Sequence, residues 1–174
     1  MARTNKIHVN GLIKAAASLF AKESLVLRVK TFSPYLPFES SILDISRPLS
    51  LVPNIHMWDL ATCANGEPNV VPVAFKDVTE DGKLVVGDVF LETTLKNLSA
   101  NGGKIAVSVY DTNTLEGYQI KGVAEYIIEG AIVDTFKAMV EKMFNGAATA
   151  KGSLIITPEK VIVTTPGADN KKVL

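Results

Sequence analysis

The feature that most constrains the fold is a series of short apolar segments separated by tight turns, which runs from residue 57 to residue 165. Asn65-Gly66 is a strong signal for a two-residue β-hairpin turn, and it separates an apolar segment at 57–63 from another at 68–77. Residues 104–110 alternate apolar side chains with small or polar ones, as a half-buried strand does. Short strands joined by tight turns predict a mainly β fold that forms an antiparallel barrel.

Two helices are predicted among these strands. The first, 93–100, has Thr93 or Thr94 as its N-terminal cap and ends at the glycine pair that follows Asn101. The second, 131–145, carries an apolar stripe of Ile132, Val133, Phe136, Val140, Met143 and Phe144. The expected strands are 57–63, 68–77, 83–88, 104–110, 118–128, 152–157 and 161–165, with a turn at Pro158-Glu159-Lys160 between the last two.

Residues 1–53 differ from the rest of the chain and are predicted to be an N-terminal extension to a domain at 54–174. They carry seven basic residues against three acidic ones. Apolar residues at helical spacing between 12 and 20 predict a helix that Asn10 caps, and four prolines between 34 and 53 predict an irregular linker. The extension is a targeting segment, a helix and linker packed on the domain, or a stretch upstream of the true start.

Charge and motif content argue against several function classes. Lys and Arg total 18, as do Asp and Glu, and a net charge of +0 argues against nucleic-acid binding. The sequence has no Walker phosphate loop, dinucleotide-binding glycine fingerprint or G-x-S-x-G elbow. No apolar run approaches the roughly 20 residues that span a bilayer.

The single cysteine, Cys63, excludes a disulfide within the chain and fits a reducing compartment, so we expect a cytoplasmic protein. Its place in an apolar strand predicts a buried structural thiol. With only His8 and His56 beside it, we expect no metal site. His56 is predicted to pack or lie on the surface.

Three segments carry a resemblance to a known family. They are PNVVPVAF at 68–75, TTLKNL at 93–98 and GYQIKGVAEY at 117–126, and the tail TTPGADNKK at 164–172 is also similar. From about residue 58 to its end, the chain resembles the pyridoxamine 5′-phosphate oxidase-like family of FMN-binding split barrels, especially its short single-domain members. The resemblance implies a six-stranded antiparallel split barrel, FMN as the cofactor, and a homodimer with the flavin between two protomers.

The start of the first helix is the predicted phosphate site. A helix N-terminus presents unpaired N–H groups and partial positive charge to an anion such as the FMN phosphate. Thr93 and Thr94 add hydroxyl donors and Lys96 adds charge, although two threonines here also suit a simple helix cap. Family members often carry Lys or Arg at the position of Thr93, and Lys96, Lys76 or Lys121 is the replacement cation that this chain offers.

The resemblance also implies contacts to the isoalloxazine ring. The strand at 71–75 is implied to run beside the ring, with Val71, Pro72, Val73 and Ala74 as contact residues and Gln119 as a further one, whereas Asp88, Val89 and Phe90 are implied to line the approach to the phosphate helix. Pro72 has no N–H and belongs at a sheet edge or bulge, which a ligand along that strand or a simple edge strand explains equally. The Gln119 amide donates and accepts hydrogen bonds, as a pyrimidine edge requires.

The predicted function is that of a flavoprotein oxidoreductase in which the flavin performs the redox chemistry, since no side chain is assigned as a catalytic acid or base. The alternatives are a non-catalytic FMN-binding or electron-transfer protein, a barrel that binds a deazaflavin or haem, and a barrel that binds oligonucleotides. Pyridoxal phosphate synthesis is not expected, because residues 170–174 lack the arginine-bearing tail of those oxidases.

Overall fold

The structure is a computed structural model that describes residues 48 and 51–174. All of these residues belong to one compact unit, Arg47–Leu174. The predicted helix at 12–20, its cap Asn10 and most of the proposed linker lie outside the described residues. The assignment of 1–53 as a separate extension therefore stays a prediction.

The described chain contains seven strands, one short 3-10 helix and two α-helices. In order they are η2 (Val52–Asn54), β1 (Trp58–Ala64), β2 (Glu67–Val73), β3 (Lys76–Val78), β4 (Leu84–Asp88), α3 (Glu92–Asn101), β5 (Lys104–Tyr110), β6 (Gly117–Ile127), α4 (Ala131–Met143) and β7 (Gly152–Val163). No helix among them is long and apolar enough to cross a membrane.

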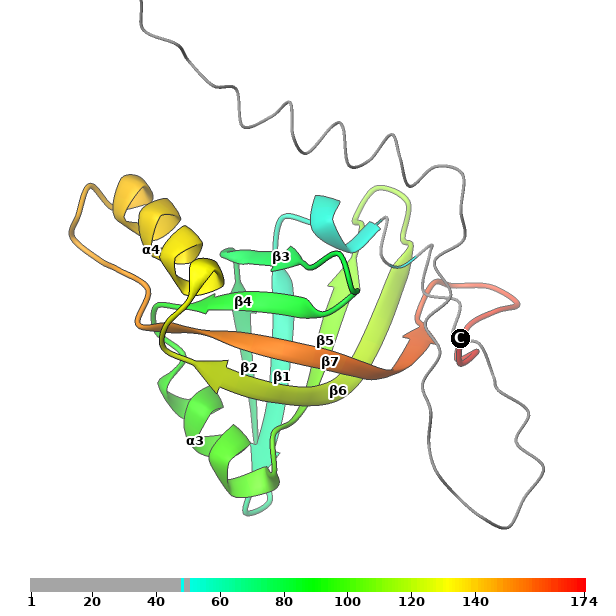
Figure 1. Cartoon of the computed structure of the whole chain (residues 1–174). Coiled ribbons are helices and arrows are strands. Elements are labelled where there is room, and N and C mark those ends of the chain that lie inside the picture. Colours follow the sequence, from blue (N-terminus) through cyan, green and yellow to red (C-terminus); the bar gives the residue numbers. More distant parts are fainter. Residues whose placement is uncertain (1–47, 49–50) are drawn as a thin grey trace, which may run out of the picture. The chain divides into compact units, whose positions relative to one another are not determined.

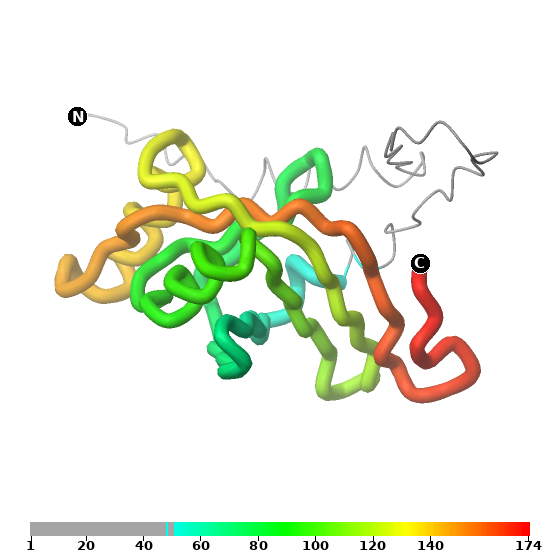
Figure 2. Tube along the Cα trace, turned by 90° about the horizontal axis from the view of Figure 1, so that it is seen from below, coloured from blue at the N-terminus to red at the C-terminus, as the bar shows by residue number. Residues whose placement is uncertain are grey.

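All seven strands form one antiparallel sheet in the order β2-β1-β5-β6-β7-β4-β3. The sheet curls strongly, and the long strands β6 and β7 run across it side by side (Figure 1). The view turned by 90° shows the same curl from below (Figure 2). The predicted mainly β split barrel is confirmed.

The structure has seven strands rather than the six that the family resemblance implies, and two strand boundaries predicted from the sequence were wrong. The predicted strand 68–77 is two strands, β2 and β3. The predicted final hairpin is one continuous strand, β7, in which Pro158 pairs with Gly122 at a β-bulge. A bulge accepts a proline that an ordinary ladder position excludes, and Gly122 leaves room because a Cβ there would collide with the Thr157 carbonyl.

Local turn chemistry explains how β1 and β2 pair. Asn65 and Gly66 have φ values of 53° and 80°, the two left-handed conformations that a type I′ hairpin turn needs. The turn places Ala64 opposite Glu67 and sets the register up to Trp58 opposite Val73. The hairpin predicted from Asn65-Gly66 is confirmed.

One face of the sheet forms the core. In β1 the buried residues Trp58, Leu60 and Thr62 alternate with more exposed ones, and Leu60 faces Val71 and Val107 across the sheet. Cys63 falls on the opposite face and is exposed, so its predicted burial was wrong. The period of two along a strand moves each next residue to the other face.

Helix α4 covers part of this core with a narrower stripe than predicted. Val133, Phe136 and Val140 are buried, and Phe136 and Val140 share a cluster with Val85, Val89 and Ala150 from β4 and the segments beside it. Met143 and Phe144, which the sequence places in the stripe, are 64% and 39% exposed. They follow Val140, the last buried residue of the helix, and the centre of the Phe144 ring lies 6.2 Å from that of the Phe75 ring.

Residues just before β1 pack with the domain. Val52 is fully buried, and the Trp58 indole Nε1 donates a hydrogen bond to its carbonyl at 3.0 Å. The Lys76 ammonium donates to the Pro53 carbonyl at 3.1 Å and lies 5.2 Å from the centre of the Trp58 ring. The packed part of the chain therefore begins before residue 54.

Two truncations test this boundary. A chain of residues 47–174 should unfold at the same urea concentration as the full chain. A chain of residues 54–174 should lose on the order of 3 kcal/mol of unfolding free energy, because it loses the buried Val52 side chain and leaves the Trp58 N–H unpaired. The fluorescence of Trp58, the only tryptophan, reports unfolding. Equal stability of the two truncated chains would contradict the role of Val52.

Candidate functional site

The fold brings two of the three segments that carry the family resemblance into contact. Asn69 on β2 donates from Nδ2 to the hydroxyl oxygen of Thr94 on α3 at 3.2 Å and to that of Thr62 on β1 at 3.3 Å. Asn97, one turn along α3, donates to the same Thr62 oxygen at 3.1 Å. This neutral network holds α3 against β1 and β2, so the start of the helix lies beside the edge of the sheet.

A buried carboxylate organises the turn between β4 and α3. Asp88 is only 1% exposed. Its Oδ1 accepts the backbone N–H of Leu91 at 2.9 Å, and its Oδ2 accepts the hydroxyl of Tyr126 at 2.8 Å. The backbone N–H of Lys151 donates to the Asp88 carbonyl at 2.8 Å. A buried charge needs such hydrogen bonds, so Asp88 is tied to β6 and to the start of β7.

The predicted threonine cap of the helix is wrong. Helix α3 begins at Glu92 with Leu91 at the cap position, and no side chain caps it. The N–H groups of Leu91 and Glu92 are already paired, with Asp88 and Phe90. Those of Thr93 and Thr94 donate to no described residue. The helix therefore offers two free backbone donors, as an anion site requires.

The two threonine side chains have different surroundings. Thr94 is 1% exposed and its oxygen accepts from Asn69, whereas Thr93 is exposed. Successive residues of a helix point about 100° apart, so both hydroxyls do not face the same direction. Of the predicted pair, Thr93 is the one whose hydroxyl an outside ligand reaches.

The basic and acidic side chains near the start of α3 are equal in number. Lys96 forms an exposed ion pair with Glu92 at 2.8 Å. The pKa of Glu92 is lowered by the hydrogen bond and charge of Lys96 and, more weakly, by the charge of Lys151. Two cations, Lys96 and Lys151, and two carboxylates, Glu92 and Asp88, thus lie near the start of α3. Lys151, which the sequence analysis missed, lies here because its backbone pairs with Asp88.

The other two candidate cations lie elsewhere. Lys76 is engaged with Pro53 and Trp58, and burial lowers its pKa against the opposing charge of Asp77. Lys121 is exposed on β6, where it pairs with Ala106 and Lys160. Neither is tied to the start of α3 in the way Lys151 is.

The predicted residues of β2 divide between the two faces of the sheet. Val71 is half-buried and Val73 is 7% exposed, and both point toward the interior beside Leu60 and Trp58. Pro72 and Ala74 are exposed. A ligand on the outside therefore reaches the side chains of Pro72 and Ala74 and not those of the two valines.

The backbone of β2 is rich in free acceptors on its outer edge. Strand β2 ends the sheet, and in a two-residue hairpin the closing pair, Ala64 and Glu67, shares both of its hydrogen bonds. Alternation then turns the backbone groups of Pro68, Val70 and Pro72 away from β1. Because proline has no N–H, this edge presents three carbonyl oxygens and a single N–H, that of Val70.

Gln119 lies apart from both segments. The register aligns Pro72, Asp59, Ser108 and Gln119 in one row on the outer face of the sheet. Three strand spacings separate Gln119 from β2, about 14 Å along the sheet. Tyr126, which touches Asp88, lies seven residues along β6 from Gln119, about 23 Å. Along the sheet, Gln119 is therefore separated both from β2 and from the part of β6 that contacts Asp88.

The remaining predicted residues flank the start of α3. Val89 is 6% exposed and packs in the core with Val85 and Phe136. Phe90 is 75% exposed. Its ring is an apolar side chain that is open to solvent just before α3.

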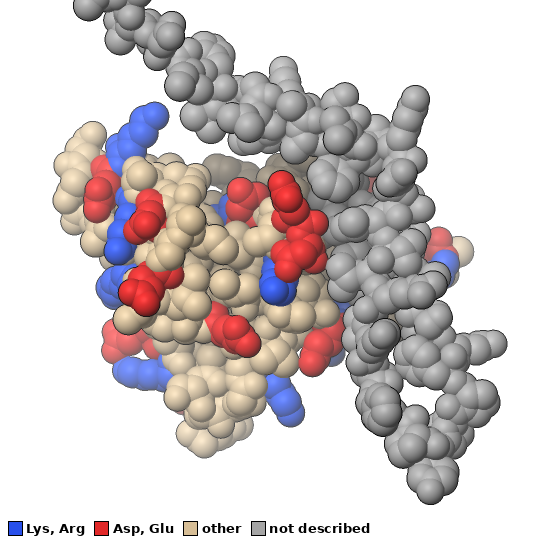
Figure 3. Space-filling view, in the orientation of Figure 1, with Lys and Arg blue, Asp and Glu red and all other residues tan. Residues whose placement is uncertain are grey.

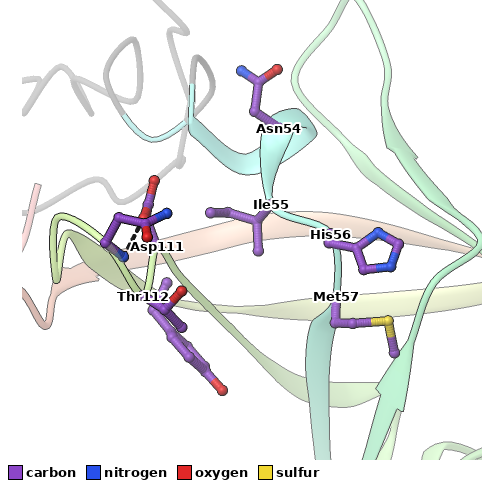
Figure 4. Close-up of a pocket in the computed structure, with 8 residues that line it drawn as sticks. Asn54, Ile55, His56, Met57, Asp111 and Thr112 are labelled. Atoms are coloured by element: carbon purple, nitrogen blue, oxygen red, sulfur yellow. Dashed lines mark hydrogen bonds between the residues drawn. The ribbon is translucent and has the colours of Figure 1, made fainter.

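A pocket of about 400 Å³ lies at another place, between residues 54–57 and 110–113. In the close-up, Ile55 points toward the side where Asp111 and Thr112 lie, while His56 and Met57 point the other way (Figure 4). His56 is exposed, as predicted. Asp111 Oδ1 accepts the backbone N–H groups of Asn113 and Thr114, so its carboxylate shapes the loop. The pocket includes none of the predicted flavin contacts.

Surface charge does not favour one class of charged partner. On the visible described face, acidic and basic side chains are interspersed (Figure 3). Across residues 48 and 51–174, no group of three or more His, Cys, Asp or Glu side chains is arranged to hold a metal ion.

Comparison with known proteins identifies the class. The family model for pyridoxamine 5′-phosphate oxidase matches residues 50–168. The chain belongs to this family, and the resemblance drawn from its sequence is confirmed. None of the curated proteins matches it.

Solved structures agree with the fold. HupZ from Group A Streptococcus is 27% identical with a TM-score of 0.58, over 71% of this chain and 96% of that one. An FMN-binding protein from Syntrophomonas wolfei subsp. wolfei is 19% identical with a TM-score of 0.58, over 72% and 88%. An F420 reductase is 18% identical with a TM-score of 0.51, over 64% and 93%. The last two comparisons show a shared fold.

Alkaline titration tests the contact between Tyr126 and Asp88. Burial, the hydrogen bond to Asp88 and its charge raise the pKa of Tyr126 to about 12. Because this folded value exceeds the unfolded one near 10, the contact stabilises the fold fully below pH 10, and its contribution is lost as the pH rises to about 12. Tyrosinate absorbance of wild type minus Tyr126→Phe should show a midpoint near pH 12. A midpoint near pH 10 would contradict the contact.

Proposed function

We propose that this protein is a flavoprotein that binds FMN with its phosphate at the start of α3 and its ring along the outer edge of β2. The observation that carries the proposal is the pair of free N–H groups at Thr93 and Thr94, held beside β2 by the contact between Asn69 and Thr94. Membership of the family adds to it, as does the neighbour named as an FMN-binding protein.

The residues at the start of α3 fit a phosphate, but they hold it with little net charge. Two backbone donors and the exposed Thr93 hydroxyl provide hydrogen bonds, and Lys96 and Lys151 provide positive charge. Glu92 and Asp88 oppose them. We therefore expect the phosphate to be bound mainly by hydrogen bonds, with lower affinity than a site carrying a cation at the position of Thr93.

The edge of β2 fits a flat ring with a polar edge. Its carbonyl oxygens accept from an N–H donor, and the Val70 N–H donates to a carbonyl acceptor; the pyrimidine edge of a flavin carries both kinds of group. Pro72 and Ala74 offer small apolar surfaces beside it. When bound, the flavin supplies hydride or electron transfer.

We further propose that the protein is an oxidoreductase. The flavin would then be the reacting group, and the protein would bind and orient the flavin. The alternative is an FMN-binding or electron-transfer protein with no substrate of its own. Steady-state turnover with NADH or NADPH separates the two. The F420 reductase neighbour keeps a deazaflavin as a second candidate cofactor, and the absorption spectrum of the purified protein distinguishes it from FMN.

We also propose a cytoplasmic homodimer. Gln119 lies three strands from β2 on the outer face of the sheet, and the proposed second copy packs on this face. The outer face next to the row of Gln119 carries Val70, Ala61 and Ala106 in register, small or apolar residues that suit close approach of another sheet, and the exposed Lys121 follows Ala106 in the same row. Closed two-fold pairing is the commonest oligomer.

Flavin titration tests the cofactor. FMN fluorescence should be quenched in a saturable manner by micromolar protein, and absence of quenching would refute the central proposal. Thr93→Ala should weaken FMN by roughly tenfold to a hundredfold, since a hydrogen bond to a charged group contributes about 1.5–3 kcal/mol. Riboflavin, which has no phosphate, should be unaffected.

Two lysine variants test whether positive charge near α3 contributes to FMN binding. Lys151→Gln should weaken FMN and leave riboflavin unchanged, whereas Lys142→Gln, at an exposed position of α4, should change neither. If Lys142→Gln weakens FMN as much, the phosphate does not lie at the start of α3.

Light scattering tests the dimer. The protein should have twice the chain mass of 18.7 kDa, and Ala106→Glu on the outer face should make it monomeric and weaken FMN. Ala138→Glu, at an exposed position of α4, should do neither. A monomeric wild-type protein that still binds FMN would show that the site is complete in one chain.

A further inference from the structure

Three parts of the chain that are far apart in sequence converge on Asp88. Leu91 at the cap of α3 donates to one carboxylate oxygen, Tyr126 on β6 donates to the other, and Lys151 before β7 donates to the backbone carbonyl. No described lysine or arginine forms an ion pair with Asp88. The carboxylate therefore depends on its hydrogen bonds, and the Tyr126 hydroxyl supplies one of the two that reach it.

The position of the Tyr126 ring is built into the sheet. A Cβ added at Gly152 would lie 2.6 Å from both Cζ and Oη of Tyr126. The absence of a side chain at Gly152 thus leaves the space in which the ring lies. The neighbouring Ser153 hydroxyl donates to the Val86 carbonyl at 2.9 Å, which fixes β7 against the strand that leads to Asp88.

A phenol hydroxyl is well suited to donate a hydrogen bond to the buried Asp88 carboxylate. With its pKa near 12, Tyr126 stays protonated at any ordinary pH and donates to Asp88 throughout. A lysine in its place would add charge, and a phenylalanine would leave one carboxylate oxygen without a partner. The contact satisfies a buried charge while adding no charge beside the free N–H groups of α3.

We propose that Tyr126 is a positioning residue for the anion-binding start of α3. It holds the Asp88 carboxylate, which holds Leu91, and Leu91 sets where the free N–H groups of Thr93 and Thr94 point. The proposal rests on the proposed function, because it assigns the phosphate end of the same site. Selectivity for FMN over riboflavin then depends on the Tyr126 hydroxyl, which lies on β6 and does not itself touch the phosphate.

The test compares Tyr126→Phe with Tyr110→Phe in the full chain. Tyr110 is 51% exposed, and its hydroxyl forms no hydrogen bond to a described residue, so its loss controls for removal of a tyrosine hydroxyl. In Tyr126→Phe the Leu91 amide should exchange with solvent about tenfold faster by NMR. The ratio of the riboflavin Kd to the FMN Kd should fall about threefold to tenfold, with the riboflavin Kd unchanged. Tyr110→Phe should alter none of these.

The outcomes separate this proposal from the one on which it rests. Unchanged exchange at Leu91 would overturn the positioning role whether or not flavin binds. Equal weakening of FMN and riboflavin would mean that Tyr126 only supports the fold. Wild-type protein that binds FMN no more tightly than riboflavin would refute the phosphate assignment and this proposal together. A preference for FMN that persists in Tyr126→Phe would refute this proposal alone.

Discussion

The burial of one face of a single curled sheet is the constraint on which the rest of the structure depends. Each strand places alternate residues inside, so the register that aligns Leu60, Val107 and Ile120 in the core also aligns Pro72, Ser108 and Gln119 outside. A slip of one residue would exchange the two faces. The type I′ turn at Asn65-Gly66 and the bulge at Gly122 fix that register, and through it they fix which groups any ligand meets.

The sequence predicted the class of fold because its signals were local. The Asn65-Gly66 turn and the alternation in 104–110 can each be recognised from a few neighbouring residues. The hairpin and the strand that they predict were both confirmed. The continuity of β7 was missed because Pro158 signals a turn, and only the partner strand shows that it lies at a bulge. The resemblance placed the site on β2 and α3, but the roles within it depend on distant contacts. No local pattern reveals that Tyr126 meets Asp88 or that Asn69 meets Thr94.

The start of α3 separates the contribution of the backbone from that of the side chains. Free backbone N–H groups are available to an anion whatever the side chains are, while the side chains set how strongly an anion is preferred. Here the buried Asp88 fixes the turn at the cost of a negative charge near the free N–H groups, and Glu92 neutralises part of Lys96. The turn before α3 is therefore held firmly, but the start of the helix carries little net positive charge. Such a site suits ligands that are bound by shape and hydrogen bonds more than by charge.

The prolines of β2 have a consequence for the behaviour of the protein at high concentration. An exposed edge strand with a full row of N–H and C=O groups is a template on which another strand adds, and this is a common route to aggregation. With Pro68 and Pro72 on the outward positions, an incoming strand finds only the Val70 N–H and loses most of the ladder. The edge that we propose for the flavin ring therefore disfavours addition of another polypeptide strand, which protects a newly made or partly unfolded chain from pairing with its neighbours.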